Sequence, residues 1–164
     1  MKSLIFRISI LLLPILVYGQ ESKSEIKHRI EEIDSQIKVS DSIGNIQKEG
    51  ISEGEIRYDY ISGKFGWEAY FINDDENKKQ PLRIRYSETQ PKANEDLNLY
   101  YRNGILVFAE LISTPISRKL KLGKSVKKNF YFNGETLIYP EIIYFDEYNY
   151  VLEKEKVIRK MIYK

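Results

Sequence analysis

The chain has 164 residues, with 26 Lys and Arg against 24 Asp and Glu, a single His and no Cys. Its length is that of one domain, and hydrophobic and charged fractions of 42% and 30% are typical of a globular protein, not of a disordered or collagen-like chain. The lack of Cys excludes disulfides, Cys-ligated zinc, thiol nucleophiles and lipid attachment at a cysteine, and one His cannot form a multi-histidine metal site. We therefore expect no metal and no cofactor.

The first nineteen residues have the pattern of a secretory signal peptide. Lys2 and Arg7 supply positive charge, residues 8–17 are almost wholly apolar, and the run ends at Gly19 before Gln20. A membrane-spanning helix needs about 20 apolar residues, so the run is too short to span, and a retained N-terminal anchor is the alternative. The pattern resembles that of exported Gram-negative proteins. It predicts cleavage after Gly19 and a periplasmic or extracellular protein without a membrane span.

The mature chain, 20–164, is predicted to be one α+β domain that begins with an amphipathic helix over about 22–40. The spacing of Ser22 and Glu25 fits a capping box. The apolar stripe repeats at helical spacing and consists of Ile26, Ile30, Ile33 and Ile37. Because this stripe is shorter than about three heptads, we expect a helix that lies on a sheet and not a coiled coil. Residues 41–54 contain three glycines and are predicted to be a loop.

From about residue 55 to 145 the hydrophobic period is two, which predicts antiparallel strands. The first two strands are expected to meet at a turn containing Ser62 and Gly63. Two Asn-Gly pairs, at 103–104 and 133–134, lie between β-prone runs and predict type I′ hairpins. Because hairpins and not helical crossovers join the strands, we expect about six to eight antiparallel strands in one sheet.

A second helix is predicted over 146–162 and is expected to pack on the sheet with the first. Asp146 is a suitable N-cap residue, and Val151 and Ile158 share one helical face. A pair of strands over the same segment is the competing interpretation.

The hairpins also resemble a known repeat. Tyr101 and Tyr131 precede the two Asn-Gly turns in a Tyr-x-x-Gly pattern, and Ser62 begins a related Ser-Gly-Lys-Phe turn. These segments resemble the strand repeats of MORN-type proteins. The family's further spaced glycines are missing after Gly104 and Gly134, so no site residue is carried over from it.

No catalytic signature is present, and we expect a protein that is not an enzyme. His28 lies off the apolar stripe between two cations, with no carboxylate placed to orient it as a base. No nucleophile-elbow, dinucleotide-binding, P-loop or zinc-protease motif occurs. A hydrolase built on a carboxylate pair is the alternative, and the acidic residues in or beside strands are Glu68, Glu88, Glu110, Glu135 and Glu141.

Two groups of residues are candidates for binding. The chain holds 13 Tyr, 7 Phe and 1 Trp, and strand tyrosines outside the core are suited to line a groove. The candidates are Tyr100, Tyr101 and Tyr131, with cross-strand packing as the alternative. A basic segment contributes Arg118, Lys119, Lys121, Lys124, Lys127 and Lys128, with a solvated strand edge as the alternative.

These observations predict an exported cell-envelope module that binds a protein or an envelope polymer, and not nucleic acid. The alternative is a periplasmic carrier of a small ligand, held between the sheet and the N-terminal helix. Residues 1–19 include two basic and no acidic residues, so the mature chain has 24 of each sign. Net charge therefore gives no argument for an acidic partner.

Overall fold

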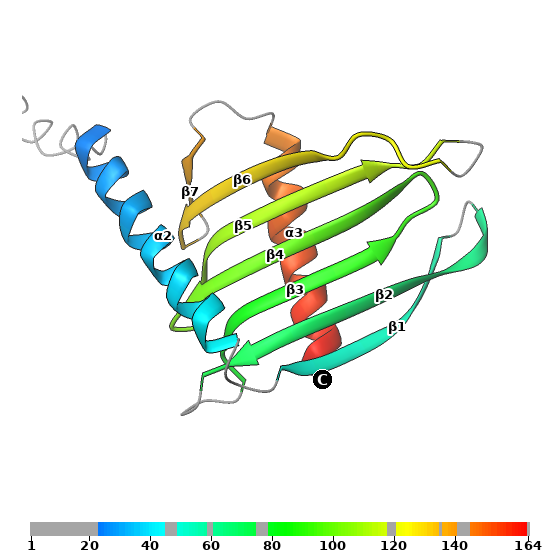
Figure 1. Ribbon diagram of the computed structural model, residues 1–164, viewed down its shortest axis with the longest axis horizontal. Helices are drawn as coiled ribbons and strands as arrows, with labels where there is room; N and C mark the ends of the chain where they lie inside the picture. The colour runs from blue at the N-terminus through cyan, green and yellow to red at the C-terminus, as the bar shows by residue number, and fades with distance from the viewer. Residues whose placement is uncertain are drawn as a thin grey trace, which may run out of the picture.

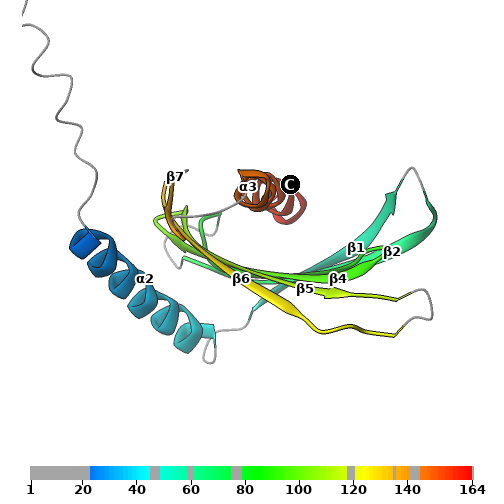
Figure 2. The same cartoon turned by 90° about the horizontal axis from the view of Figure 1, so that it is seen from above.

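The computed structural model describes residues 23–44, 49–58, 61–74, 79–117, 121–134, 136–140 and 145–163. Within these ranges the chain forms one seven-stranded antiparallel sheet with a helix on each face (Figure 1, Figure 2). This confirms the predicted α+β class and the expected number of strands. The predicted signal peptide over 1–19 lies outside the described residues.

The strands pair in the order in which they occur in the chain. The sheet is curved, and we call the face that carries the C-terminal helix concave and the opposite face convex (Figure 2). The strands are β1 (Gly50–Tyr58), β2 (Ile61–Asn73), β3 (Pro81–Thr89), β4 (Ala93–Arg102), β5 (Ile105–Pro115), β6 (Val126–Asn133) and β7 (Thr136–Tyr139).

Strand β1 begins inside the segment 41–54 that was predicted to be a loop. That prediction was wrong for residues 50–54, which are in the strand, and for residues 41–44, which are helical. Gly50 lies opposite Phe71, and Gly54 lies opposite Trp67. A Cβ atom at Gly50 would come within 2.4 Å of the Phe71 ring, and one at Gly54 within 2.7 Å of the Trp67 indole. These two glycines are strand positions that make room for aromatic rings.

The hairpin turns differ from one another. Asn103 and Gly104 have φ values of 53° and 74°, as the predicted type I′ turn requires. In the second hairpin Asn133 pairs with Thr136, so Gly134, with φ of 63°, is the first connecting residue in place of Asn133. The turn predicted at Ser62 and Gly63 is also misplaced, because both residues lie within β2.

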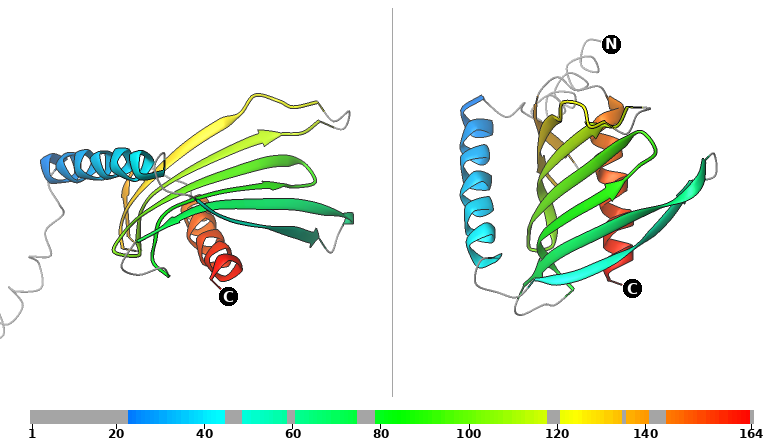
Figure 3. Two further views of the ribbon diagram at one scale, coloured as in Figure 1. Left: turned by 60° about the horizontal axis from the view of Figure 1, so that its bottom comes forward. Right: turned by 45° about the vertical axis from the view of Figure 1, so that its right-hand side comes forward.

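Helix α3 (Phe145–Ile162) crosses the concave face (Figure 3), so the helix prediction is confirmed over the strand alternative. Val151 and Ile158 are fully buried against sheet residues such as Leu97 and Phe130. Full burial of an aliphatic or aromatic side chain contributes about 1.5–3 kcal/mol. This cluster is the main core.

Helix α2 (Lys23–Gly44) lies on the convex face, over one end of the strands (Figure 2). It ends four residues later than predicted, and Asp41 in its last turn contacts the buried Arg83 guanidinium at 2.5 Å. Ile33 of the apolar stripe packs on three aromatic rings, those of Tyr100, Phe108 and Tyr131. The two helices therefore cover two separate cores. Neither is long and apolar enough to cross a membrane.

Candidate functional site

A row of six cross-strand partners lies on the concave face beside α3. Glu88 pairs with Glu95, and the row continues from strand to strand in both directions. We call this row the distal strip, and its members from β6 to β1 are Val126, Ser113, Glu95, Glu88, Trp67 and Gly54. Adjacent strands are about 4.8 Å apart, so the strip is about 24 Å long.

Two carboxylates lie at the centre of the distal strip. Glu88 and Glu95 have only 2% and 6% of their surface exposed. Lys154 of α3 donates a hydrogen bond from Nζ to Glu88 Oε2 at 2.6 Å, and Gln90 donates from Nε2 to Glu88 Oε1 at 2.6 Å. The Tyr150 hydroxyl of α3 donates to Glu95 Oε1. Because Tyr150 and Lys154 are four residues apart, they lie on one flank of the helix, above this pair.

The environments of the two carboxyl groups displace their pKa values in opposite directions. Burial acts to raise the pKa of Glu88, but the hydrogen bonds from Lys154 and the Tyr86 hydroxyl outweigh it, so this pKa lies below its ordinary value. Burial also raises the pKa of Glu95, and the Tyr150 hydrogen bond offsets it only in part. Opposed shifts of this kind are typical of acid and base pairs in enzymes. Here both groups are covered and already bonded to α3, which favours a role in fixing the helix to the sheet.

Open space lies beside the carboxylate pair at the β5–β6 end of the distal strip. A separate cavity of about 470 Å³ at the β1–β3 end is lined mainly from the convex face, because Glu68, Ser87 and Thr89 in its wall alternate with the strip residues Trp67 and Glu88. A mostly apolar cavity of about 390 Å³ lies under the start of α3 and is lined by residues that include Ser113, Val126 and Tyr150. The distal strip is therefore polar and filled at its centre, and mostly apolar at the β5–β6 end, where space is free.

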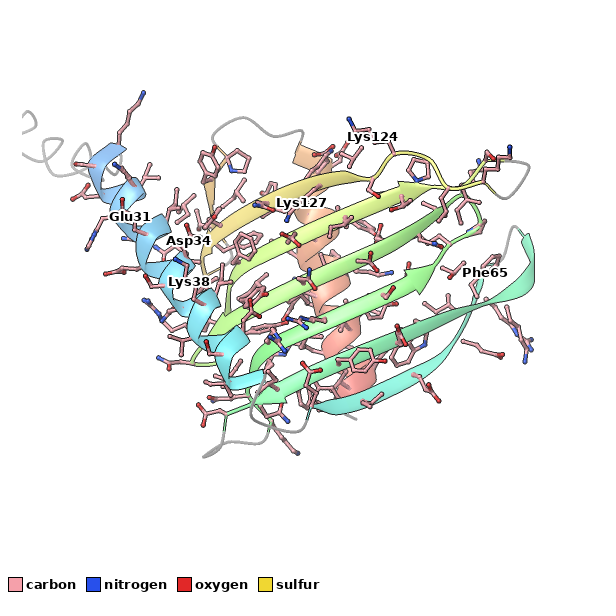
Figure 4. All side chains as sticks on the ribbon, in the orientation of Figure 1. Glu31, Asp34, Lys38, Phe65, Lys124 and Lys127 are labelled. Atoms are coloured by element: carbon pink, nitrogen blue, oxygen red, sulfur yellow. The ribbon has the colours of Figure 1, made fainter. Side chains whose placement is uncertain are left out.

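Beyond the distal strip, the strand ends extend past α3. Ile56 pairs with Phe65, and Ala93 with Pro115, one alternation further out on the same face. Figure 4 shows Phe65 at the end of β2 that is remote from both helices. None of these four residues is fully buried. The concave face therefore continues as an uncovered apolar surface.

The three candidate tyrosines are buried in the two cores. Tyr100 and Tyr131 lie under α2, and their hydroxyls donate to Asp41 Oδ1 at 3.1 Å and to Asp34 Oδ1 at 2.9 Å. Burial, with the Asp41 charge, raises the pKa of Tyr100 to about 12. Tyr101 lies on the opposite face, in the α3 core. The three rings therefore pack in the cores, and the hydroxyls of Tyr100 and Tyr131 hold α2 on the sheet. A role of the three tyrosines in binding stays a prediction.

The basic segment is not brought together as one patch in the part of it that the structure describes. Lys121 and Lys124 are exposed between β5 and β6. Lys127 lies on the convex face (Figure 4) and contacts Glu110 at 2.5 Å. Lys128 instead pairs with Glu147 of α3, on the concave face. The two remaining candidates, Arg118 and Lys119, lie outside the described residues.

Most of the distal strip was not predicted from the sequence. Glu88 was named among the acidic residues in or beside strands, but its cross-strand partner Glu95 was not. The contacts of Tyr150 and Lys154 with this pair were not predicted either. A signal was present, since Glu88 and Glu95 occupy the same alternating face as Tyr86 and Leu97, where a charged residue is unusual. The cross-strand register that brings the pair together is a property of the folded sheet.

A second hollow lies between α2 and the hairpin ends. It consists of two cavities of about 390 Å³ each, which share Arg102 and Asn103 in their walls. We call it the α2 groove, and its walls include Ile33, Gln36, Val39, Leu82, Arg102 and Asn103.

Among the described residues, no cluster of three or more His, Asp or Glu side chains is placed to hold a metal ion. Comparison with models of known protein families, with curated proteins and with solved structures finds no match. The functional argument therefore depends on the geometry of the distal strip and of the α2 groove.

Proposed function

We propose that this protein is an exported cell-envelope module that binds another protein or an envelope polymer through the distal strip. The observation that supports the proposal is the register-aligned row of six residues across six strands, which lies along one flank of α3 and has only its central carboxylates covered by that helix. An extended peptide rises about 3.3 Å per residue, so the strip has the length of about seven residues. Its free space lies beside Val126, at the β5–β6 end.

Binding at the distal strip would combine two kinds of contact. The half-buried Trp67 and the part-exposed Tyr150 offer rings with a polar edge, which are common anchors in interfaces. The α3 flank holds the carboxylates in fixed positions, so that the floor of the strip is rigid. A rigid floor lowers the entropic cost of ordering a partner.

Site-specific photo-crosslinking tests the proposal in the living cell. Ser113 and Thr114 are neighbours on β5 and face opposite sides of the sheet, which makes them a matched pair. A photoreactive residue at position 113 is expected to give discrete adducts with a partner, whereas one at 114 is not. Equal adducts at both positions, or none at either in folded protein, would count against a protein partner.

A polymer partner is tested by co-sedimentation of the purified mature protein with peptidoglycan sacculi. Ser113→Arg fills the cavity beside Val126 and is expected to abolish co-sedimentation, while Thr114→Arg preserves it. If neither the sacculi nor the crosslinking experiment detects a partner at position 113, the proposed function is wrong.

A second candidate function is supported by the α2 groove. A carrier needs a pocket of roughly 300 Å³ or more for a small ligand, and each of the two adjoining cavities is about 390 Å³. They lie between the N-terminal helix and the sheet, where a small ligand was expected from the sequence. We therefore propose ligand carriage as the alternative to macromolecular binding.

A further inference from the structure

We infer that the α2 groove binds a single-chain amphiphile, with its anionic headgroup at Arg102 and its apolar chain between α2 and β3. The inference rests on the second proposed function, that a small ligand binds in this groove, and adds the chemistry of the ligand. It is independent of the distal strip, which lies on the other face of the sheet.

Arg102 is the cation at the centre of the groove. It lines both cavities, and it is exposed at the end of β4 beside the turn at Asn103. Within the part of the chain that the structure describes, its guanidinium has no hydrogen-bond or ion-pair partner. Guanidinium groups bind carboxylate and phosphate oxygens through two parallel hydrogen bonds. An anionic headgroup would supply these bonds, and the Asn103 side-chain amide lies beside it as a further donor.

The carboxylates in the walls are kept apart from this centre. Glu32 lines only the first cavity, and its Oε1 is 3.4 Å from His28 Nε2. Asp74 lines only the second. Because Arg102 and Asn103 are shared by both cavities, the junction is cationic while each acid lies in one cavity alone. This arrangement favours an anion at the junction over one at either end.

The second cavity has apolar walls that suit a hydrocarbon chain. Val39 and Ile43 of α2 face Leu82 of β3 across it, and Val39 has 59% of its surface exposed. These residues lie outside the Ile33 contact that fixes α2 to the sheet.

Isothermal titration of the mature protein with laurate, below the micelle concentration, tests the inference. We expect saturable one-site binding of laurate and of dodecyl phosphate, and at least tenfold weaker binding of dodecanol and of acetate. Arg102→Gln is expected to weaken laurate binding about tenfold, because a charge-assisted hydrogen-bond pair is lost. Val39→Asp places a charge in the apolar wall and is expected to abolish binding. Lys160→Gln, which removes an exposed cation on α3, should leave it unchanged.

The outcomes separate the two levels of the proposal. If dodecanol binds as tightly as laurate and Arg102→Gln changes neither, the anionic headgroup is wrong while ligand carriage stands. If no amphiphile binds to the folded protein, both are wrong. If laurate binding survives Val39→Asp but is lost in Ser113→Arg, the ligand occupies the distal strip and the assignment to the α2 groove is overturned.

Discussion

Glu88 and Glu95 lie directly opposite each other on β3 and β4, buried beside α3, and among the residues that the structure describes a cation contacts Glu88 but not Glu95. Two neighbouring carboxylates repel each other when both are ionised. The Lys154 ammonium and the Tyr86 hydroxyl hold the charge on Glu88, while burial disfavours a charge on Glu95. The two carboxyl groups therefore differ in protonation: Glu88 keeps its negative charge, and Glu95 is the first of the two to be protonated as the pH falls.

Glu88→Gln is expected to lower the free energy of unfolding at pH 7 by about 2–3 kcal/mol. The substitution leaves the Lys154 side chain, only 15% exposed, without its anion. Because the folded-state pKa of Glu88 lies below its ordinary value, its stabilisation is present at neutral pH and is lost as the pH falls through that pKa. Urea unfolding should therefore show a gap between variant and wild type that closes in acid. A variant as stable as the wild type at pH 7 would refute the role of this ion pair.

Glu95→Gln is expected to have the opposite sign. The folded-state pKa of Glu95 is raised, so its contribution is complete below the ordinary pKa and is lost as the pH rises through the folded value. The neutral amide avoids this loss, so the variant should be more stable than the wild type at pH 8 and equally stable near pH 4. Glu53→Gln, at an exposed β1 position, serves as the control and should show no such trend. Destabilisation by Glu95→Gln at pH 8 would contradict the prediction.

Gly54→Ala is expected to displace the single Trp of the chain. The new Cβ would lie 2.7 Å from Trp67 Nε1, whereas a Cβ at Gly66 would meet nothing within 4 Å. Overpacking of this kind costs about 1–3 kcal/mol, while Gly66→Ala should be neutral or slightly stabilising. Near-ultraviolet circular dichroism and Trp emission should change in the first variant and not in the second. Identical spectra for both would show that β1 does not enclose the indole.

Tyr131→Phe is expected to loosen α2 without unfolding the sheet. The hydroxyl donates to Asp34 at 2.9 Å, and its loss should cost about 1 kcal/mol. Hydrogen exchange should then be faster in the amides of α2 and unchanged in those of β3 and β4. Tyr139→Phe, on a side chain that is 45% exposed, is the control. Equal acceleration throughout the sheet would mean that α2 and the strands unfold as one unit.

Processing of the signal sequence is a separate prediction. The exported protein is expected to begin at Gln20, because Gly19 is the small residue that signal peptidase requires before the cut. Intact-mass analysis of the envelope fraction should show this form, and Gly19→Trp should leave a longer precursor. Full-length protein in the membrane fraction of wild-type cells would support the retained anchor.

Local patterns predicted the elements well because each depends on neighbours in sequence. The Asn103 turn and the stripe around Ile33 are set by φ preference and by helical period, both of which can be read from a few residues. The α3 helix was open to a strand interpretation, and the structure resolves it through Val151 and Ile158, whose common face the sheet buries.

The predictions that failed concern residues whose surroundings are set by contacts across the sheet. Gly50 and Gly54 were interpreted as loop residues, since nothing local shows that Phe71 and Trp67 lie on them. Register likewise creates the distal strip, and no spacing in the sequence brings Glu88 to Glu95. The candidate site was therefore largely unpredictable, whereas the class of fold was not.

The sequential strand order has a consequence for folding. Each strand pairs only with its neighbours along the chain, so the sheet can grow by adding one hairpin at a time, with short loops to close. Helix α3 is different, because its contacts reach residues on strands from β2 to β6. During synthesis, which starts at the N-terminal end, these eighteen residues arrive after all seven strands. Until they do, the concave face is bare, and a partner that binds apolar strands would compete with the protein's own C-terminus.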